Sequence, residues 1–153
     1  MRVPLGYDMA GSRLRSIGPL LVEYDMLGSR PSMLGDQELG YDMLGSRLRS
    51  IGQTRIDYDM AGSRPIRLGS SDLSYDMLGN RLRSIGPHEL EYDMLGSRVR
   101  RVGRVTIDYD LLESRPSALE TPDEAAPTDE EIIEVYLVLD RLRRAASASS
   151  TGA

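Results

Sequence analysis

The sequence predicts a mainly β protein made of seven antiparallel β-hairpin repeats, followed by one C-terminal α-helix. Three observations support this fold class. A tyrosine recurs every 17 residues and opens a unit of nearly constant sequence. Apolar and polar residues alternate beside each tyrosine, as is typical of strands that bury one face. The 15 glycines and 8 prolines fall at regular intervals, which indicates many short strands joined by turns.

Each unit has the form YDMLGSRLRSIG followed by five variable residues. With Tyr counted as position 1, position 2 is Asp and position 7 is Arg in all seven units, and position 3 is Met in six. Because seven near-identical units cannot arise by chance, residues 1–119 are interpreted as one repeat domain. The repeat tyrosines are Tyr7, Tyr24, Tyr41, Tyr58, Tyr75, Tyr92 and Tyr109, and the repeat arginines are Arg13, Arg30, Arg47, Arg64, Arg81, Arg98 and Arg115.

Each unit is predicted to form one hairpin. From Ile56 to Met60, the residues Ile, Tyr and Met share one face and the aspartates share the other. Asp at position 2 and Gly at position 5 fit a type I turn followed by a glycine bulge. This turn would place position 1 opposite position 7, so each Tyr would meet an Arg on the apolar face. We expect this ladder to fill and cover the core, with a ligand-binding ladder as the alternative.

A second period overlies the first at position 8, which alternates between Leu14, Pro31, Leu48 and Pro65. Proline cannot donate a ladder hydrogen bond, so the even units are expected to place this strand at a sheet edge or a bulge. Because a flat sheet of fourteen strands is unusual, we expect the hairpins to form a curled or two-layered sheet. A parallel β-solenoid is the competing fold, disfavoured because its stacked Asp and Arg residues would form like-charge ladders.

The last third of the chain predicts a linker over 120–127, a helix over 128–146 and a disordered tail over 147–153. Thr128 and Glu131 have the spacing of a capping box at a helix start. A strand is the alternative, because the run EVYLVL is rich in β-branched residues. The broad apolar stripe must be covered by the sheet or by a second copy, so we interpret it as an assembly helix. Its residues are Ile132, Ile133, Tyr136 and Leu139.

The two ends of the repeat array differ. In the seventh unit, Glu113 and Glu120 replace the two glycines, so this unit is interpreted as a degenerate cap that stops further stacking. The N-terminal side has no evident cap and begins in strand register, with Val3 and Leu5 on one face. This asymmetry favours a limited assembly, such as a dimer joined through the N-terminal edge or through the helix.

The fifth unit, YDMLGNRLRSIG over 75–86, resembles the YD repeats of the rearrangement-hotspot family, and the other units keep Tyr-Asp-x-x-Gly with Ser in place of Asn80. In that family the repeats are β-hairpins that build large spiral shells around secreted toxins or form extracellular adhesion surfaces. The resemblance covers roughly residues 3–119 and implies hairpin geometry. The spacing of 17 residues is shorter than is usual in that family, and the chain is too short to enclose a cargo, so encapsulation is not expected.

Composition argues against several functions. Without cysteine and with one histidine, His88, the chain lacks the residues for thiolate or histidine-rich metal sites. His88 itself is expected to be a solvated turn residue. The net charge of −5 arises entirely in the C-terminal segment, so the neutral repeat body has no electrostatic footprint for nucleic acid. No apolar run approaches the ~20 residues of a membrane span and no secretory signal is seen. We therefore expect no membrane partner and a cytoplasmic location, with export by another route left open.

These observations predict no catalytic residues, no cofactor and no metal. An aspartate that recurs in every unit suits a structural role, since an active site is normally built once. The predicted function is a non-enzymatic repeat scaffold or interaction module that presents a β-sheet surface and self-associates, as a homo-oligomer or with a protein partner. One alternative is a self-assembling filament or shell component built by sheet-edge stacking. The other is a glycan-binding or adhesion module, which the family resemblance implies.

Overall fold

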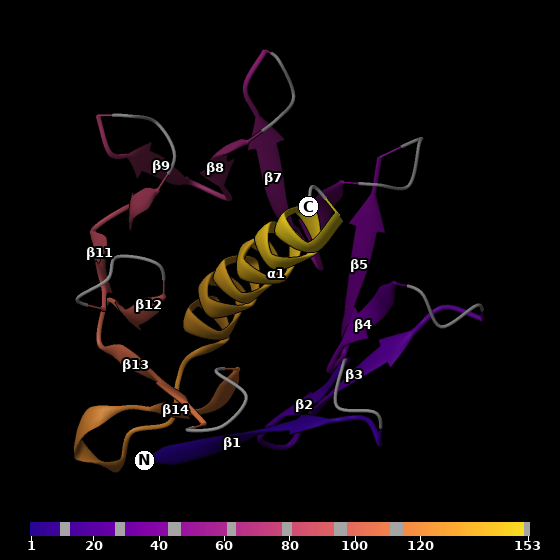
Figure 1. Ribbon diagram of the computed structural model, residues 1–153, viewed down its shortest axis with the longest axis vertical. Helices are drawn as coiled ribbons and strands as arrows, with labels where there is room; N and C mark the ends of the chain where they lie inside the picture. The colour runs from indigo at the N-terminus through magenta and orange to yellow at the C-terminus, as the bar shows by residue number, and fades with distance from the viewer. Residues whose placement is uncertain are drawn as a thin grey trace.

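The computed structural model describes residues 1–9, 13–26, 30–42, 47–60, 64–77, 81–93, 98–110 and 115–151, with side chains as far as Arg143. Within these ranges, fourteen strands, all paired antiparallel, form a closed barrel, and the ring of strands surrounds an α-helix (Figure 1). The mainly β hairpin fold is thus confirmed. The sheet curls until it closes on itself, and the two-layered arrangement is not formed.

The elements follow the 17-residue period. The strands are β1 (Arg2–Tyr7), β2 (Leu14–Ile17), β3 (Leu20–Tyr24), β4 (Pro31–Leu34), β5 (Gln37–Tyr41), β6 (Leu48–Ile51), β7 (Thr54–Tyr58), β8 (Pro65–Leu68), β9 (Ser71–Tyr75), β10 (Leu82–Ile85), β11 (His88–Tyr92), β12 (Val99–Val102), β13 (Val105–Tyr109) and β14 (Pro116–Glu120). They are followed by a 3-10 turn, η1 (Pro122–Glu124), and by the helix α1 (Asp129–Thr151).

Every hairpin contains a β-bulge beside its tyrosine. In the first hairpin Gly6 pairs with Ser16 and Tyr7 pairs with Leu14, so Arg15 is an extra residue in the second strand. The same shift recurs in the other six hairpins. The predicted pairing of position 1 with position 7 is therefore wrong, because position 1 lies opposite position 8. The predicted turn glycines at position 5, Gly11, Gly28, Gly45, Gly62, Gly79 and Gly96, lie outside the described residues.

The bulge also changes the environment of position 8. Leu48 and Leu82 are buried in the core, and Pro65, which begins β8, is buried as well. Position 8 therefore lies on the inner face in odd and even units alike. The predicted sheet edge at the prolines is wrong, since both kinds of unit have a partner strand on each side, whereas the predicted bulge is present. A proline in the first position of a strand is tolerated there.

The barrel closes between β1 and β14. Val3 pairs with Leu119, and both side chains are buried. The backbone N–H of Thr121 donates to the carbonyl of Met1 at 2.9 Å, while the amino group of Met1 donates back to the Thr121 carbonyl. The expectation of a free N-terminal edge and a terminal cap is thus corrected. The partial unit before Tyr7 supplies the strand that the seventh unit lacks.

The helix α1 occupies the interior of this barrel. All seven residues from Ile132 to Val138 are buried, and they cover about two turns, so every side of the helix is enclosed. Ile132, Ile133 and Tyr136 of the predicted assembly helix are therefore covered by the chain's own strands and are not exposed to a second copy. Leu139 packs partly buried against the same core. The helix continues to Thr151, through most of the segment expected to be disordered.

Candidate functional site

One rim of the barrel, which we call the tyrosine rim, is formed by the repeat tyrosines and arginines where the odd-numbered strands end. Each arginine connects two units. The Nε of Arg13 donates to Asp8 Oδ2 of its own unit at 2.8 Å, and its Cζ lies 4.7 Å from the ring centroid of Tyr24 in the next unit. Each of these arginines therefore stacks on the tyrosine of a neighbouring unit, and the bulge places position 8, not position 7, opposite the tyrosine of its own unit. The stacked pairs, at 4.1 to 4.7 Å, are Arg13–Tyr24, Arg30–Tyr41, Arg47–Tyr58, Arg64–Tyr75, Arg81–Tyr92, Arg98–Tyr109 and Arg115–Tyr7.

The tyrosine hydroxyl groups complete the connection between units. Tyr24 donates to the carbonyl of Leu14 at 2.8 Å, and Tyr7 donates to the carbonyl of Pro116 at 2.6 Å across the seam of the barrel. Burial raises the pKa of Tyr7 and of Tyr109 to about 12, so both hydroxyls remain protonated donors at neutral pH. With a guanidinium on its ring and its hydroxyl bonded, each repeat tyrosine serves to join adjacent hairpins.

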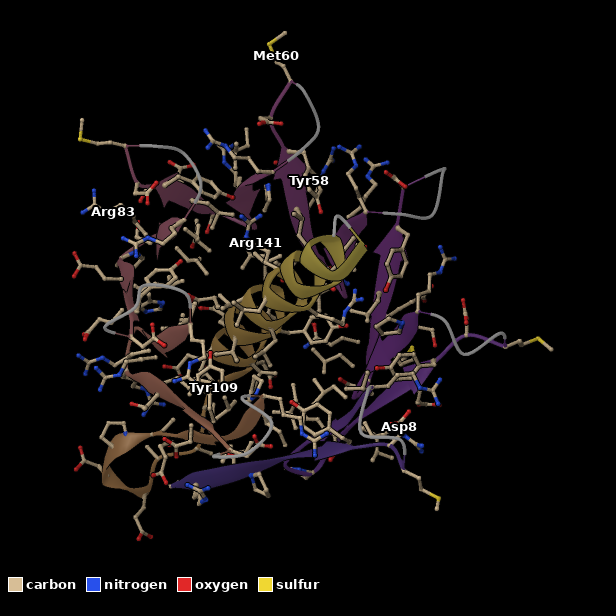
Figure 2. The ribbon with its side chains drawn as sticks, in the orientation of Figure 1. Asp8, Tyr58, Met60, Arg83, Tyr109 and Arg141 are labelled. Carbon is tan, nitrogen blue, oxygen red and sulfur yellow. The ribbon has the colours of Figure 1, made fainter. Side chains whose placement is uncertain are left out.

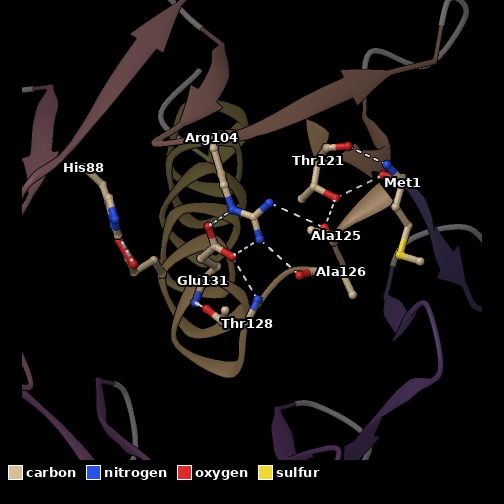
Figure 3. Close-up of polar contacts among 9 residues, drawn as sticks. Met1, His88, Arg104, Thr121, Ala125, Ala126, Thr128 and Glu131 are labelled. Atoms are coloured by element: carbon tan, nitrogen blue, oxygen red, sulfur yellow. Dashed lines mark hydrogen bonds and ion pairs between the residues drawn. The ribbon is translucent and has the colours of Figure 1, made fainter. Parts of the chain in front are cut away.

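Two polar contacts connect the N-terminal part of α1 to the barrel. The expectation that His88 is a solvated turn residue is wrong, because it begins β11 and its Nδ1 lies 2.7 Å from Oε1 of Glu134 on α1 (Figure 3). Burial raises the pKa of Glu134, and the hydrogen bond with His88 only partly offsets that effect. Glu134 is itself buried, so this pair holds one carboxyl group of the helix within the barrel.

The second contact involves the start of the helix. The capping box is confirmed: Glu131 N–H donates to Thr128 Oγ1 at 3.1 Å and Thr128 N–H donates to Glu131 Oε1 at 2.9 Å. Arg104, in the turn between β12 and β13, donates from Nε and Nη2 to the same carboxylate at 2.7 and 2.8 Å (Figure 3). Burial alone would raise the pKa of Glu131, but the bonds from Arg104 and Thr128 lower it.

Glu134, the one of these two carboxyl groups that is buried, is thus bonded to His88. Within the described ranges, no cluster of three or more His, Asp or Glu side chains is placed to hold a metal ion. No helix in that part of the chain is long and apolar enough to cross a membrane. Of the site residues predicted from sequence, the repeat tyrosines and arginines lie at one rim of the barrel, and the apolar helix residues lie in its core.

Sequence reasoning missed a group of exposed methionines on the tyrosine rim. Four residues at position 3 have exposed fractions of 101 to 107%, and we call them the tip methionines: Met9, Met26, Met60 and Met77. Figure 2 shows Met60 pointing away from the barrel. The alternation pattern placed this position on the apolar face, whereas the strand ends two residues earlier, at the tyrosine. Met43 and Met94 hold the same repeat position and lie outside the described residues.

The tips share one local geometry that explains this exposure. The Asp59 N–H donates to the Arg64 carbonyl at 3.0 Å, and the equivalent bond is present in all seven units. Position 3 follows the donor of this bond, which is the outermost of each hairpin among the described residues, and lies two residues beyond the strand end. Because all odd-numbered strands of an antiparallel barrel run in one direction, the four side chains lie on the same rim. Arg141 of α1, whose Cζ lies 5.4 Å from the Tyr75 ring centroid, places the C-terminal half of the helix near that rim.

Comparisons with known proteins add no functional assignment. No family model, curated protein or solved structure matches this chain.

Proposed function

We propose that this protein is a non-enzymatic scaffold that self-associates through the tip methionines of its tyrosine rim. The observation that carries the proposal is that four methionines at one repeat position are fully exposed on the same rim. Methionine is normally among the buried residue types, and it adapts readily to apolar contact surfaces. A side chain that projects so far from the barrel contributes little to the fold, so contact with another molecule is the role that remains for it.

Divergence among the units supports this interpretation. Position 14 has changed freely: it is Leu20, Gln37, Thr54, Ser71 and His88 in successive units. Position 3 stays Met in six units and is Leu, which is also apolar, in the seventh. An apolar identity that persists at an exposed position, while other positions vary, favours a shared function of the tips.

A second copy of this chain is the occupant we propose for the rim. Each described tip is flanked by an Asp and an Arg of its own unit that pair with each other, such as Asp8 with Arg13 at 2.8 Å and Asp76 with Arg81 at 3.2 Å. Identical rims that face each other therefore bring together apolar side chains beside paired charges, and Arg141 of α1 is a further cation near the rim. A ring of equivalent tips is also self-complementary, which is the requirement for an isologous contact. The other exposed apolar wall residues, Leu21 and Ile66, belong to separate strands.

The test is light-scattering mass over an about 100-fold concentration range. We expect the mass of the wild-type chain to rise above that of a monomer, and a variant with all four tip methionines changed to Gln to remain lighter at the same concentrations. Met33→Gln, on the outer wall in β4, is the matched control and should behave as the wild type. A wild-type chain that stays monomeric, or a four-site variant with unchanged mass, would refute the proposal.

The two alternatives make different demands on the barrel. Stacking through sheet edges requires the seam between β1 and β14 to open, since each of the described strands already pairs on both sides. Glycan binding by the tyrosines requires displacement of the guanidinium groups stacked on them. A reducing compartment such as the cytoplasm suits the proposed contact, because thioethers remain apolar there.

A further inference from the structure

The tip methionines have a chemical property that bears on the regulation of the same rim. Resting on the proposed self-association, we propose that they are a methionine oxidation site, and that conversion to the sulfoxide releases the contact between copies. Their exposed fractions exceed 100%, whereas Met33 on the barrel wall is only partly exposed. The chain contains no cysteine, so no thiol competes for the oxidant. Oxidation susceptibility follows exposure, and it therefore favours the four tips.

The oxidant is a peroxide, and the step is a two-electron oxygen transfer. The thioether sulfur attacks one peroxide oxygen, the O–O bond breaks and an S–O bond forms. The released hydroxide takes up the proton left on the transferred oxygen, which gives one sulfoxide and one water from hydrogen peroxide. A sulfoxide reductase reverses the change: two thiols become one disulfide, and the oxygen leaves as water.

The geometry separates the effect on assembly from any effect on the fold. A sulfoxide is polar, so it opposes burial of the tip against a second copy. The same change occurs at four equivalent places on one rim, and the individual losses therefore act together. Because the tip methionines project away from the barrel, their oxidation leaves the core and the Tyr–Arg stacking in place. Assembly should be lost while the free energy of unfolding is retained.

The experiment uses the full chain and limiting hydrogen peroxide. Peptide mass mapping should show Met9, Met26, Met60 and Met77 oxidised several-fold faster than Met33. Light scattering on the same samples should show the mass falling as these sulfoxides form, and a methionine sulfoxide reductase should restore it. A variant with the four tip methionines changed to Leu is the matched control: its tips remain apolar, so it should assemble and keep its mass in peroxide.

The possible failures can be told apart. If the untreated chain is monomeric at every concentration, the proposed self-association is wrong, and the regulation that rests on it is wrong too. If the chain assembles and the four sulfoxides form without any fall in mass, only the proposed regulation is overturned. Oxidation of Met33 as fast as the tips, or equal sensitivity of the Leu variant to peroxide, would also overturn it.

Discussion

Substitutions on opposite sides of α1 should both be costly, because the helix is enclosed by the barrel on every side. Val135 and Leu137 are two residues apart and so point in nearly opposite directions from the helix axis, at about 200°. Their exposed fractions are 1% and 2%. A helix lying on one face of an open sheet would leave one of these side chains in water, where truncation has little effect.

The size of the effect follows from burial. Leu137→Ala should lower the free energy of unfolding by about 2–5 kcal/mol, the usual range for a fully buried leucine. Val135→Ala removes two buried methyl groups, at ~0.8 kcal/mol each, and leaves a cavity, which gives about 2 kcal/mol in total. For a chain of 153 residues, a loss of 2 kcal/mol corresponds to a fall in melting temperature of about 4–8 °C.

Urea denaturation followed by circular dichroism is the assay, at a concentration where the chain is monomeric by light scattering, with Met60→Ala as the control. Met60 is fully exposed, so this variant should remain within about 0.5 kcal/mol of the wild type. If the helix is enclosed, both core variants should lose a substantial part of the free energy of unfolding. If either Val135→Ala or Leu137→Ala matched the Met60 control, the helix would have an open side, and its proposed enclosure would be wrong.

Two further predictions concern the polar contacts. Glu134 has a raised pKa when folded, so the stability of the wild type relative to Glu134→Gln should be greatest below the unfolded Glu pKa of about 4.3 and should fall as pH rises through the folded value. Glu131 has a lowered pKa, so its contribution to the free energy of unfolding, relative to Glu131→Gln, should be present above about pH 4.3 and be lost at lower pH. Urea titrations over this pH range measure both effects, and a wild type whose stability runs parallel to that of both variants would contradict both predictions. A double-mutant cycle of Arg47→Gln with Tyr58→Leu should give a coupling of about 0.5–1 kcal/mol, whereas Arg47 with the distant Tyr92 should give none.

The repeat could be predicted from sequence because its signals are local. Alternation around Tyr58 and the regular glycines define the strands without reference to distant residues. The capping box of Thr128 and Glu131 is local as well, and the helix begins as predicted. The partner of each arginine could not be predicted, since the extra residue at Arg15 has no side-chain signature and it shifts the register by one.

Closure and helix placement depend on relations between distant parts of the chain. Val3 meets Leu119 only because seven hairpins curl through a full turn, and no local pattern specifies that curvature. The helix did carry a signal, because its apolar surface was too broad for one contact face. That signal indicated that the helix must be covered, but it did not indicate that the barrel of strands covers it. The sequence pattern wrongly placed Met60 on the apolar face, because the alternation was extended beyond Tyr58, where the strand ends.

The most direct test of the closed barrel is a disulfide across its seam. Arg2 and Glu120 are register partners on β1 and β14, and antiparallel partners lie about 4.5–5.5 Å apart at Cα, within the range that a disulfide spans. In this cysteine-free chain, Arg2→Cys with Glu120→Cys should form a bond within one molecule on oxidation at low concentration, while the control pair Arg2→Cys with Arg67→Cys on β8 should not. A seam pair that stays reduced, or that crosslinks only between molecules, would contradict the closed barrel.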